Sequence, residues 1–259
     1  MRLSERVSAV RARGAFAASY PPGFMPRAII PHRWPGPPLP ARLVERPNKF
    51  LLVCRLGRRT VEAHVPDRGR CLDLLVPGRE LVLVNATGAL RRTSYTALLA
   101  RSSSGSWVSL DPAGAPRLVK AALERGLLAP LRGLRAVRAE VALRGSRIDL
   151  LLEPGGVLCE VKSVGAAREG VALFPDAPTL RGLKHLLLLS RLARKGQRTA
   201  VVLCAQRGDV HAIRPDREID PAFAKALSRA AQAGVILAGL RCAAHPEGME
   251  VQGEIPVLG

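Results

Sequence analysis

The sequence predicts a two-domain α+β protein in which a small β barrel precedes an α/β sandwich. Between about residue 42 and residue 112, short apolar runs alternate with turn residues, and no helical pattern interrupts them. From about residue 113 onward, stretches of helical periodicity alternate with buried strands. The 259 residues are 47% hydrophobic, which is enough apolar material for one large or two ordinary cores.

A proline-rich segment precedes both domains. Eight of the 21 prolines fall in residues 1–41, and this density disfavours a helix or a central strand. We therefore expect an extended, poorly ordered arm over residues 1–41. Arginines outnumber its single acid, Glu5, so one interpretation is a basic arm that contacts nucleic acid. A dispensable extension is the interpretation we favour.

Five strands are expected in the first domain, residues 42–112, and a turn at Gly57 makes the first two a hairpin. Five short strands without a helix are typical of a Greek-key barrel of the OB type, a common binder of oligonucleotides. Phe50 and Tyr95 are candidate stacking or core aromatics, and the core is the role that we favour for Phe50. The expected strands are residues 50–54, 60–65, 80–85, 93–101 and 107–110. The basic residues expected in its binding groove are Arg46, Lys49, Arg91 and Arg92.

The second domain, residues 113–259, begins with a helix that ends at Gly126. A second helix begins at the N-cap Thr179, and a third begins at Asp220-Pro221, since Pro suits the first helical position. Helix, three strands, helix, strand and helix is the order of restriction-endonuclease-like cores. The expected elements are helix 117–125, strands 137–143, 147–152 and 157–164, helix 180–195, strands 199–204 and 211–214, a helix from 221, and strands 235–242 and 251–257.

Two neighbouring strands of this domain hold the most informative residues. Asp149 lies in one apolar run, and Glu160 and Lys162 lie in the next. The turn signal Glu153-Pro-Gly-Gly156 separates them, so the two strands should pair and bring Asp149 close to Glu160. Glu160 and Lys162 are two residues apart on one strand and must point to the same face.

Two carboxylates and an ammonium group on one face are costly unless a function uses them. Asp149 and Glu160 suit a hard divalent cation, assisted by the backbone carbonyl of Val161. Lys162 would then lie beside an attacking water or a phosphate oxygen. This is the layout of the Asp…Glu-x-Lys nucleases, and it predicts Mg²⁺ as the cofactor. The alternative is a solvated salt bridge, because Glu-x-Lys occurs by chance in many strands.

The charge of the chain points to a polyanionic partner, DNA or possibly RNA. The formal net charge is +19, although only six of the 40 basic residues are lysine, and such an arginine bias can reflect genome composition. The five cysteines are widely spaced, which favours reduced thiols in a cytoplasmic protein without a zinc site. No stretch reaches the roughly 18 apolar residues of a membrane helix. No Walker A or dinucleotide glycine pattern indicates a small-molecule cofactor, and the oligomeric state stays open.

Six further strings carry a family resemblance: Phe174-Pro-Asp-Ala-Pro-Thr179, Arg181-Gly182, His185-Leu186, Ala205-Gln-Arg-Gly-Asp-Val210, Ile219-Asp-Pro-Ala-Phe-Ala224 and Ala233-Gly-Val235. Together with Ser146-Arg-Ile-Asp149 and Glu160-Val-Lys-Ser-Val164, they strongly resemble the sugar fermentation stimulation protein family (SfsA) from roughly residue 42 to the C-terminus. The resemblance implies an OB-like domain joined to a PD-(D/E)xK nuclease-like domain, DNA binding, a role in regulating sugar-utilisation genes, and nuclease activity. The catalytic positions it implies are Asp149, Glu160 and Lys162.

Further nucleic-acid contacts are expected around the second helix of the α/β domain. Arg181 and His185, four residues apart on one helical face, would face the phosphate backbone. Arg207, at the end of a buried strand, is another candidate phosphate contact. Asp176 is expected either to cap the helix or to supply a further acid near the metal ligands, and capping is the role that we favour.

Departures from the family pattern favour a second interpretation. In the helix that normally contributes a Glu, Ala121 occupies the aligned position, and Glu124 follows a turn later. The barrel string His64-Val-Pro-Asp-Arg-Gly69 also differs from the family's His-Cys-Pro-Asn-Thr-Gly. The chain could therefore be a non-catalytic DNA-binding regulator of sugar-utilisation genes.

Overall fold

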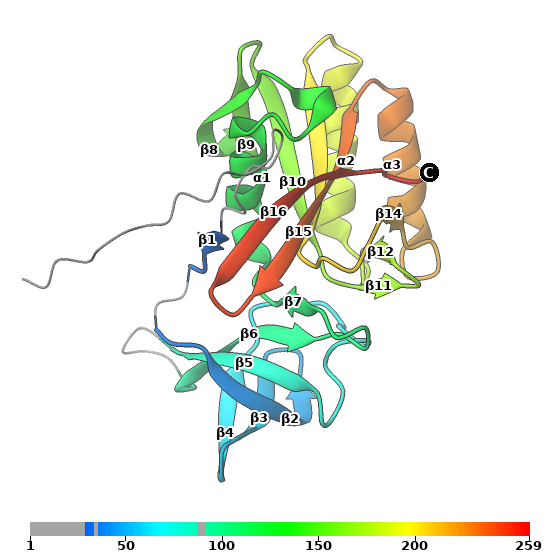
Figure 1. The fold of residues 1–259 in the computed structure, drawn as a ribbon. Helices are drawn as coiled ribbons and strands as arrows, with labels where there is room; N and C mark the ends of the chain where they lie inside the picture. The colour runs from blue at the N-terminus through cyan, green and yellow to red at the C-terminus, as the bar shows by residue number, and fades with distance from the viewer. Residues whose placement is uncertain (1–28, 34–35, 87–91, 144) are drawn as a thin grey trace, which may run out of the picture.

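A computed structural model describes residues 29–33, 36–86, 92–143 and 145–259 and places them in two domains, a barrel and an α/β sandwich (Figure 1). The barrel is a closed ring of five strands in the order β4-β3-β2-β5-β6, with β4 also paired to β6. Its strands are β2 (Leu39–Asn48), β3 (Leu51–Leu56), β4 (Arg59–His64), β5 (Glu80–Asn85) and β6 (Tyr95–Arg101).

The five-stranded barrel is confirmed, but its membership differs from the prediction. The strand before Phe50, β2, belongs to the ring, whereas β7 (Trp107–Ser109) lies outside it. β7 pairs with β6 on one side and with β15 (Ile236–His245) on the other, so one sheet continues from the barrel into the second domain. This continuity fixes the two domains to each other through backbone hydrogen bonds.

The expectation of a poorly ordered arm over residues 1–41 is wrong for its last part. β1 (Ile29–Pro31) pairs with β16 (Gly248–Ile255), and β2 begins at Leu39. Arg33 donates to the Asp111 carboxylate at 2.8 Å. Proline is compatible with both strands. β1 pairs with β16 and lies at the edge of the sheet, and Pro40 is the second residue of β2. Residues 1–28 lie outside the described part of the chain.

The α/β domain has a central sheet in the order β15-β13-β10-β9-β8. β10, β13 and β15 are parallel, whereas β9 and β8 run antiparallel as a hairpin extension. The remaining elements are β8 (Arg135–Leu143), β9 (Ser146–Glu153), β10 (Val157–Val164), β13 (Thr199–Ala205), α1 (Ala115–Glu124), α2 (Leu180–Ala193), α3 (Pro221–Gln232) and a small sheet of β11 (Ala167–Arg168), β12 (Val171–Phe174) and β14 (Ala212–Pro215).

Helices cover both faces of this sheet, which explains why its strands are apolar on both sides. α1 packs with the cluster that includes Leu150 and Cys159, and α2 and α3 pack with the cluster that includes Leu158 and Val164. Alternation along β10 therefore puts Glu160 on the face covered by α2 and α3. A charged residue on that face lies under a helix, not in bulk water.

The helix starts follow the predicted caps. The Thr179 hydroxyl accepts from the Gly182 N–H at 3.0 Å, and the Asp220 carboxylate accepts from the Phe223 N–H at 2.8 Å. Asp176 does not cap α2. Its carboxylate accepts instead from the Cys71 N–H in the barrel domain, at 3.0 Å. The side chain that was expected to start a helix thus ties the two domains together.

Within the described ranges, none of the helices is long and apolar enough to cross a membrane. All five cysteines are free and buried.

Candidate functional site

The hairpin of β9 and β10 brings Asp149 and Glu160 together. The antiparallel register ends at the pair Leu150 and Cys159, so the next opposed positions are 149 and 160. Beyond that pair, the Asp149 carboxylate accepts a hydrogen bond of 2.7 Å from the Val161 N–H. The Asp149 side chain is therefore held directly against the segment of β10 that carries Glu160.

Glu160 is the most deeply placed acid of the site, with 2% of its surface exposed. Its Oε1 atom accepts from the ammonium group of Lys162 and lies 2.5 Å from Nδ1 of His185 on α2. Its Oε2 atom is buried and has no hydrogen-bond partner among the described residues. A buried carboxylate oxygen without a partner is costly, and such atoms are frequently ion or water ligands.

The environment raises the pKa of Asp149 from its ordinary 3.8 to about 6. Burial is the main cause, and the negative charge of Glu160 adds to it; the Val161 N–H and Lys162 partly oppose the shift. A bound cation would remove this repulsion by neutralising both acids. Asp149 and Glu160 are thus electrostatically coupled neighbours, as the turn at Glu153–Gly156 predicted.

Asp149 and Lys162 face a cleft of about 570 Å³ between the two domains, and Glu160 does not line it but contacts Lys162. The α/β domain contributes Asp149, Lys162 and Arg181, and the barrel domain contributes the segment from Pro66 to Gly69. Gly69 lies so close to the Asp176 carboxylate that an added Cβ would be 2.2 Å from an oxygen. No larger residue fits at this contact without moving the wall of the cleft.

Comparison with family models decides the family. Residues 44–110 match the SfsA N-terminal OB domain, and residues 114–248 match the sugar fermentation stimulation protein RE domain. The chain belongs to the SfsA family.

Curated members of the SfsA family align over most of the chain. The sugar fermentation stimulation protein homolog of Chloroflexus aurantiacus is 42% identical over 225 residues, 86% of each chain. The homolog of Moorella thermoacetica is 40% identical over 217 residues, 80% of this chain and 93% of that protein. A solved structure of Pyrococcus furiosus SfsA in complex with Ca²⁺ matches with a TM-score of 0.79 and 27% identity, covering 89% of this chain and all of that one.

Two of the residues expected to contact phosphate in this SfsA-family chain are buried. His185 is 3% exposed and contacts the Glu160 carboxylate from α2. It therefore positions the acid and does not face solvent. Arg207 is 4% exposed, and its guanidinium is bound to Asp209 at 2.7 Å and to Asp73 of the barrel domain at 3.1 Å. Spacing alone did not reveal which helical and strand faces are covered. Arg181 is exposed and lines the cleft, as a phosphate contact requires.

The basic residues expected in the barrel groove lie in different places. Arg46 donates to the Gly69 carbonyl at 2.8 Å and to the Arg70 carbonyl, so it supports the barrel wall of the cleft. Lys49 is exposed in the turn between β2 and β3. Arg92 is exposed before β6, and Arg91 lies outside the described residues.

Phe50 contradicts its expected core position. It is 41% exposed, with the Lys49 ammonium group 5.1 Å from the ring centroid and the Arg68 guanidinium 5.8 Å away. Because Arg68 also lines the cleft, the ring lies near its barrel-side wall. The tight β2–β3 turn has no interior position for it.

Sequence reasoning missed further acids in the cleft, notably Asp67 and Glu140. Burial raises the pKa of Asp67 to about 6, and the neighbouring charge of Asp176 contributes. Glu140 is paired with Arg147 at 3.1 Å and lies opposite Asp149 across the β8–β9 ladder. Asp67 comes from the other domain, and no local pattern places it beside the hairpin. The string Val65-Pro66-Asp67-Arg68-Gly69 was the available signal, as a variant of a family motif.

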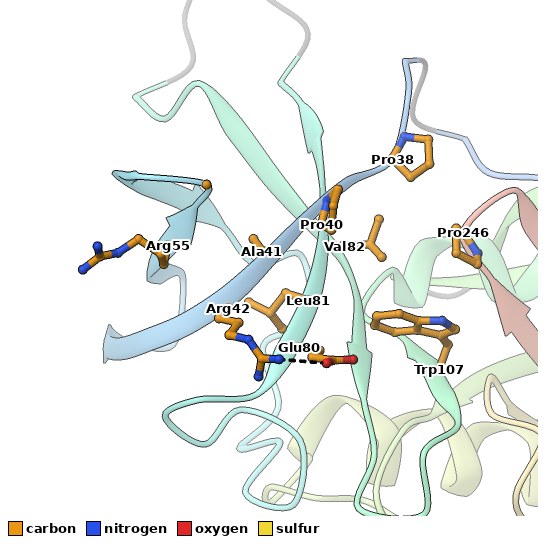
Figure 2. Close-up of a pocket in the computed structure, with 11 residues that line it drawn as sticks. Pro38, Pro40, Ala41, Arg42, Arg55, Glu80, Leu81, Val82, Trp107 and Pro246 are labelled. Atoms are coloured by element: carbon orange, nitrogen blue, oxygen red, sulfur yellow. Dashed lines mark hydrogen bonds and ion pairs between the residues drawn. The ribbon is translucent and has the colours of Figure 1, made fainter.

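A second hollow, of about 580 Å³, is lined mostly by residues of the barrel domain and is shown in Figure 2. Trp107, Val82, Pro40 and Pro246 line it, and its one carboxylate, Glu80, is paired with Arg42 at 3.1 Å. It offers an apolar surface without the converging acids of the interdomain cleft. The cleft is therefore the better candidate for chemistry.

Proposed function

We propose that this SfsA-family chain is a Mg²⁺-dependent nuclease with a PD-(D/E)xK-type site that hydrolyses phosphodiester bonds in DNA or RNA. The observation that carries the proposal is the unpartnered Oε2 of the buried Glu160 beside the coupled carboxylate of Asp149. A hard cation is the ligand that satisfies such an oxygen and relieves the repulsion between two acids.

The donor set of the site fits Mg²⁺. Asp149, Glu160 and the backbone carbonyl of Val161 would hold it, because Mg²⁺ uses one or two carboxylates and keeps several waters. No group of three or more His, Cys, Asp or Glu side chains in the described ranges is placed so that it could hold a metal ion, so the proposed site uses two carboxylates, one backbone carbonyl and water. The P. furiosus relative was solved with Ca²⁺, another hard cation that prefers oxygen ligands.

The cation, when bound, would polarise the scissile phosphate and lower the pKa of a water molecule. Three side chains would bind the substrate or position the acids. Lys162 is 15% exposed and reaches the cleft, where its ammonium group can orient the attacking water or offset charge on the phosphate. Arg181, at the start of α2, would hold a neighbouring phosphate. His185 keeps the Glu160 side chain in place through Oε1 and leaves Oε2 available.

The second candidate function is a DNA-binding regulator of sugar-utilisation genes without turnover. One observation favours it. α1 supplies no carboxylate to the cleft, because Ala121 packs against the core cluster and Glu124 is exposed at the far end of the helix from the cleft-lining Pro116. The intact set of Asp149, Glu160 and Lys162 favours the enzyme, since a site without a function has no reason to keep buried charges.

A cleavage assay with Mg²⁺ on single- and double-stranded DNA and RNA tests the proposal. We expect Mg²⁺-dependent products that disappear with EDTA and fall by roughly two orders of magnitude in Lys162→Ala. Lys184→Ala, an exposed lysine of α2 that lies outside the cleft, is the matched control. Binding without cleavage of any substrate would favour the regulator. The free, buried cysteines are consistent with work in the reducing cytoplasm.

A further inference from the structure

The interdomain cleft restricts what can reach the acids. Asp149 and Lys162 line this cleft and Glu160 is buried next to them, so a scissile phosphate must enter the cleft to approach the two acids. One wall of the cleft is the Pro66–Gly69 segment of the barrel domain, and the other includes Lys162 and Arg181. A substrate therefore has to pass between two domains, not merely lie on one surface.

The cleft is held at its present width by buried contacts between the domains. Arg207 of the α/β domain binds Asp73 of the barrel domain, and Asp209 accepts from Ser102 at 3.0 Å. Asp176 accepts from the Cys71 N–H, and the sheet is continuous through β7 and β15. Opening the cleft widely would leave a buried guanidinium short of partners, which is costly.

An exposed aromatic residue, Phe50, lies next to Arg68, which belongs to the barrel wall of this cleft. Phe50 is at the β2–β3 turn, beside the cleft wall, since its carbonyl accepts from the Val65 N–H at 3.0 Å. Arg68 contacts both the Phe50 ring and the cleft. Lys49 and Arg68 are exposed and long, so they can pair with phosphates while a base takes their place over the ring.

We propose that the cleft takes a single strand of nucleic acid, with one unpaired base stacked on Phe50 and the scissile phosphate between Lys162 and Arg181. The inference rests on the proposed nuclease function and names the substrate class of that site. An aromatic platform flanked by cations binds single strands, because every unpaired base has a free π-face and each nucleotide brings a phosphate. In a duplex the base faces are stacked inside, so they are unavailable to Phe50.

The decisive substrate is one labelled DNA molecule with a duplex half and a single-stranded half of equal length. With Mg²⁺ and the full-length chain, we expect cuts in the single-stranded half at least about ten-fold more often than in the duplex half. Equal cutting in both halves would overturn the single-strand inference and leave the nuclease function standing. No cutting in either half, nor in an RNA molecule of the same design, would refute the nuclease function and with it this inference.

Substitution of the platform separates stacking from general charge attraction. Phe50→Ala should lower the affinity for a single strand in Ca²⁺ roughly ten-fold, and Phe50→Trp should retain it or improve it. Val44→Ala is the matched control, because Val44 is 42% exposed on the barrel and lines neither hollow. Fluorescence anisotropy with single-stranded and duplex probes of one sequence provides the readout. Equal losses for both probes in Phe50→Ala would count against a stacked base.

Discussion

Nδ1 of His185 lies 2.5 Å from Oε1 of Glu160, and both side chains are buried. This contact joins α2 to the strand that carries the candidate metal ligand. It also explains why a polar residue occurs on the covered face of the helix, where an apolar residue would be expected. The imidazole is a positioning group for the acid.

Removing that group should destabilise the protein and misplace Glu160. We expect His185→Ala to lower the free energy of unfolding by about 1–3 kcal/mol, because it leaves Glu160 with fewer buried partners. Urea denaturation in EDTA measures the change. Ser190→Ala on the same helix is the control, since the Ser190 hydroxyl donates to the Leu186 carbonyl of its own helix. Equal, small effects in both variants would mean that the His185 contact contributes little.

Metal binding should be visible as stabilisation. A cation that binds only the folded state raises the melting temperature, by an amount that grows with its concentration. We expect Mg²⁺ and Ca²⁺ to raise the melting temperature of the wild-type chain and to have little effect on Asp149→Asn or Glu160→Gln. Glu80→Gln, which alters an exposed ion pair of the barrel, should respond as wild type does. An unchanged metal shift in Asp149→Asn would place the cation elsewhere.

The raised pKa of Asp149 predicts how metal binding depends on pH. A carboxyl with a pKa of about 6 must lose its proton before it can bind a cation, so the apparent affinity should fall as the pH drops through 6. Titration calorimetry with Ca²⁺ from about pH 5 to about pH 8 should show a plateau above about pH 7. An affinity that is constant down to pH 5, roughly one unit below this pKa, would contradict the prediction.

The raised pKa of Asp149 also affects the stability of the metal-free chain, and here the pH dependence has the opposite sign to that of metal affinity. Because the pKa in the folded state is about 6 and the ordinary value is 3.8, the folded chain holds protons that the unfolded chain has already lost. Its stability should therefore fall as the pH rises from about 4 to about 6, and this component should shrink in Asp149→Asn. Asp67 has a similarly raised pKa and contributes in the same direction, so a residual slope in the variant is expected.

The buried contacts between Arg207 and Asp209 should contribute to the free energy of unfolding of the chain. Burial acts to raise the pKa of Asp209, but hydrogen bonds from Arg207 and Ser104 outweigh it and hold the pKa below its usual range. Asp209→Ala removes a partner of a buried guanidinium, and we expect a loss of about 2–4 kcal/mol in urea denaturation. Glu80→Gln should cost less than about 1 kcal/mol, as exposed pairs do. The Asp209 contribution is present above pH 3.8 and is lost as the pH falls further.

The salt dependence of binding tests whether the first residues matter. Each neutralised phosphate of a single strand contributes about −0.7 to the slope of log affinity against log salt. We expect a chain lacking residues 1–28 to keep the slope of the full-length chain, because Lys49, Arg68, Lys162 and Arg181 lie in the described domains. This deletion leaves the pairing of β1 with β16 intact. Anisotropy titrations of both chains measure the slope, and a much flatter slope after deletion would assign the contacts to the removed segment.

The sequence by itself determined the three helices and the central strands of the α/β domain, together with the central acid pair. Local signals sufficed for these, since the caps Thr179 and Asp220 start their helices and the turn at Glu153–Gly156 pairs the two strands that carry Asp149 and Glu160. Alternation along β10 fixed the common face of Glu160 and Lys162. Each of these inferences depends on residues that are close in the chain, where backbone geometry allows few arrangements.

Only the tertiary structure decided which side chains are covered and which residues from the barrel domain reach the site. Periodicity gave Arg181 and His185 one helical face, but packing against β10 buried His185 and left Arg181 at the cleft. Likewise, Arg207 follows a strand, where a phosphate contact was expected, but it is buried in a contact with Asp73 of the barrel domain. Phe50 was expected in the core but is exposed. Asp67 and Asp149 are 82 positions apart in the numbering and share a cleft only because β7 and β15 join the domains. Burial and long-range pairing depend on the whole packed chain, so no local pattern could have supplied them.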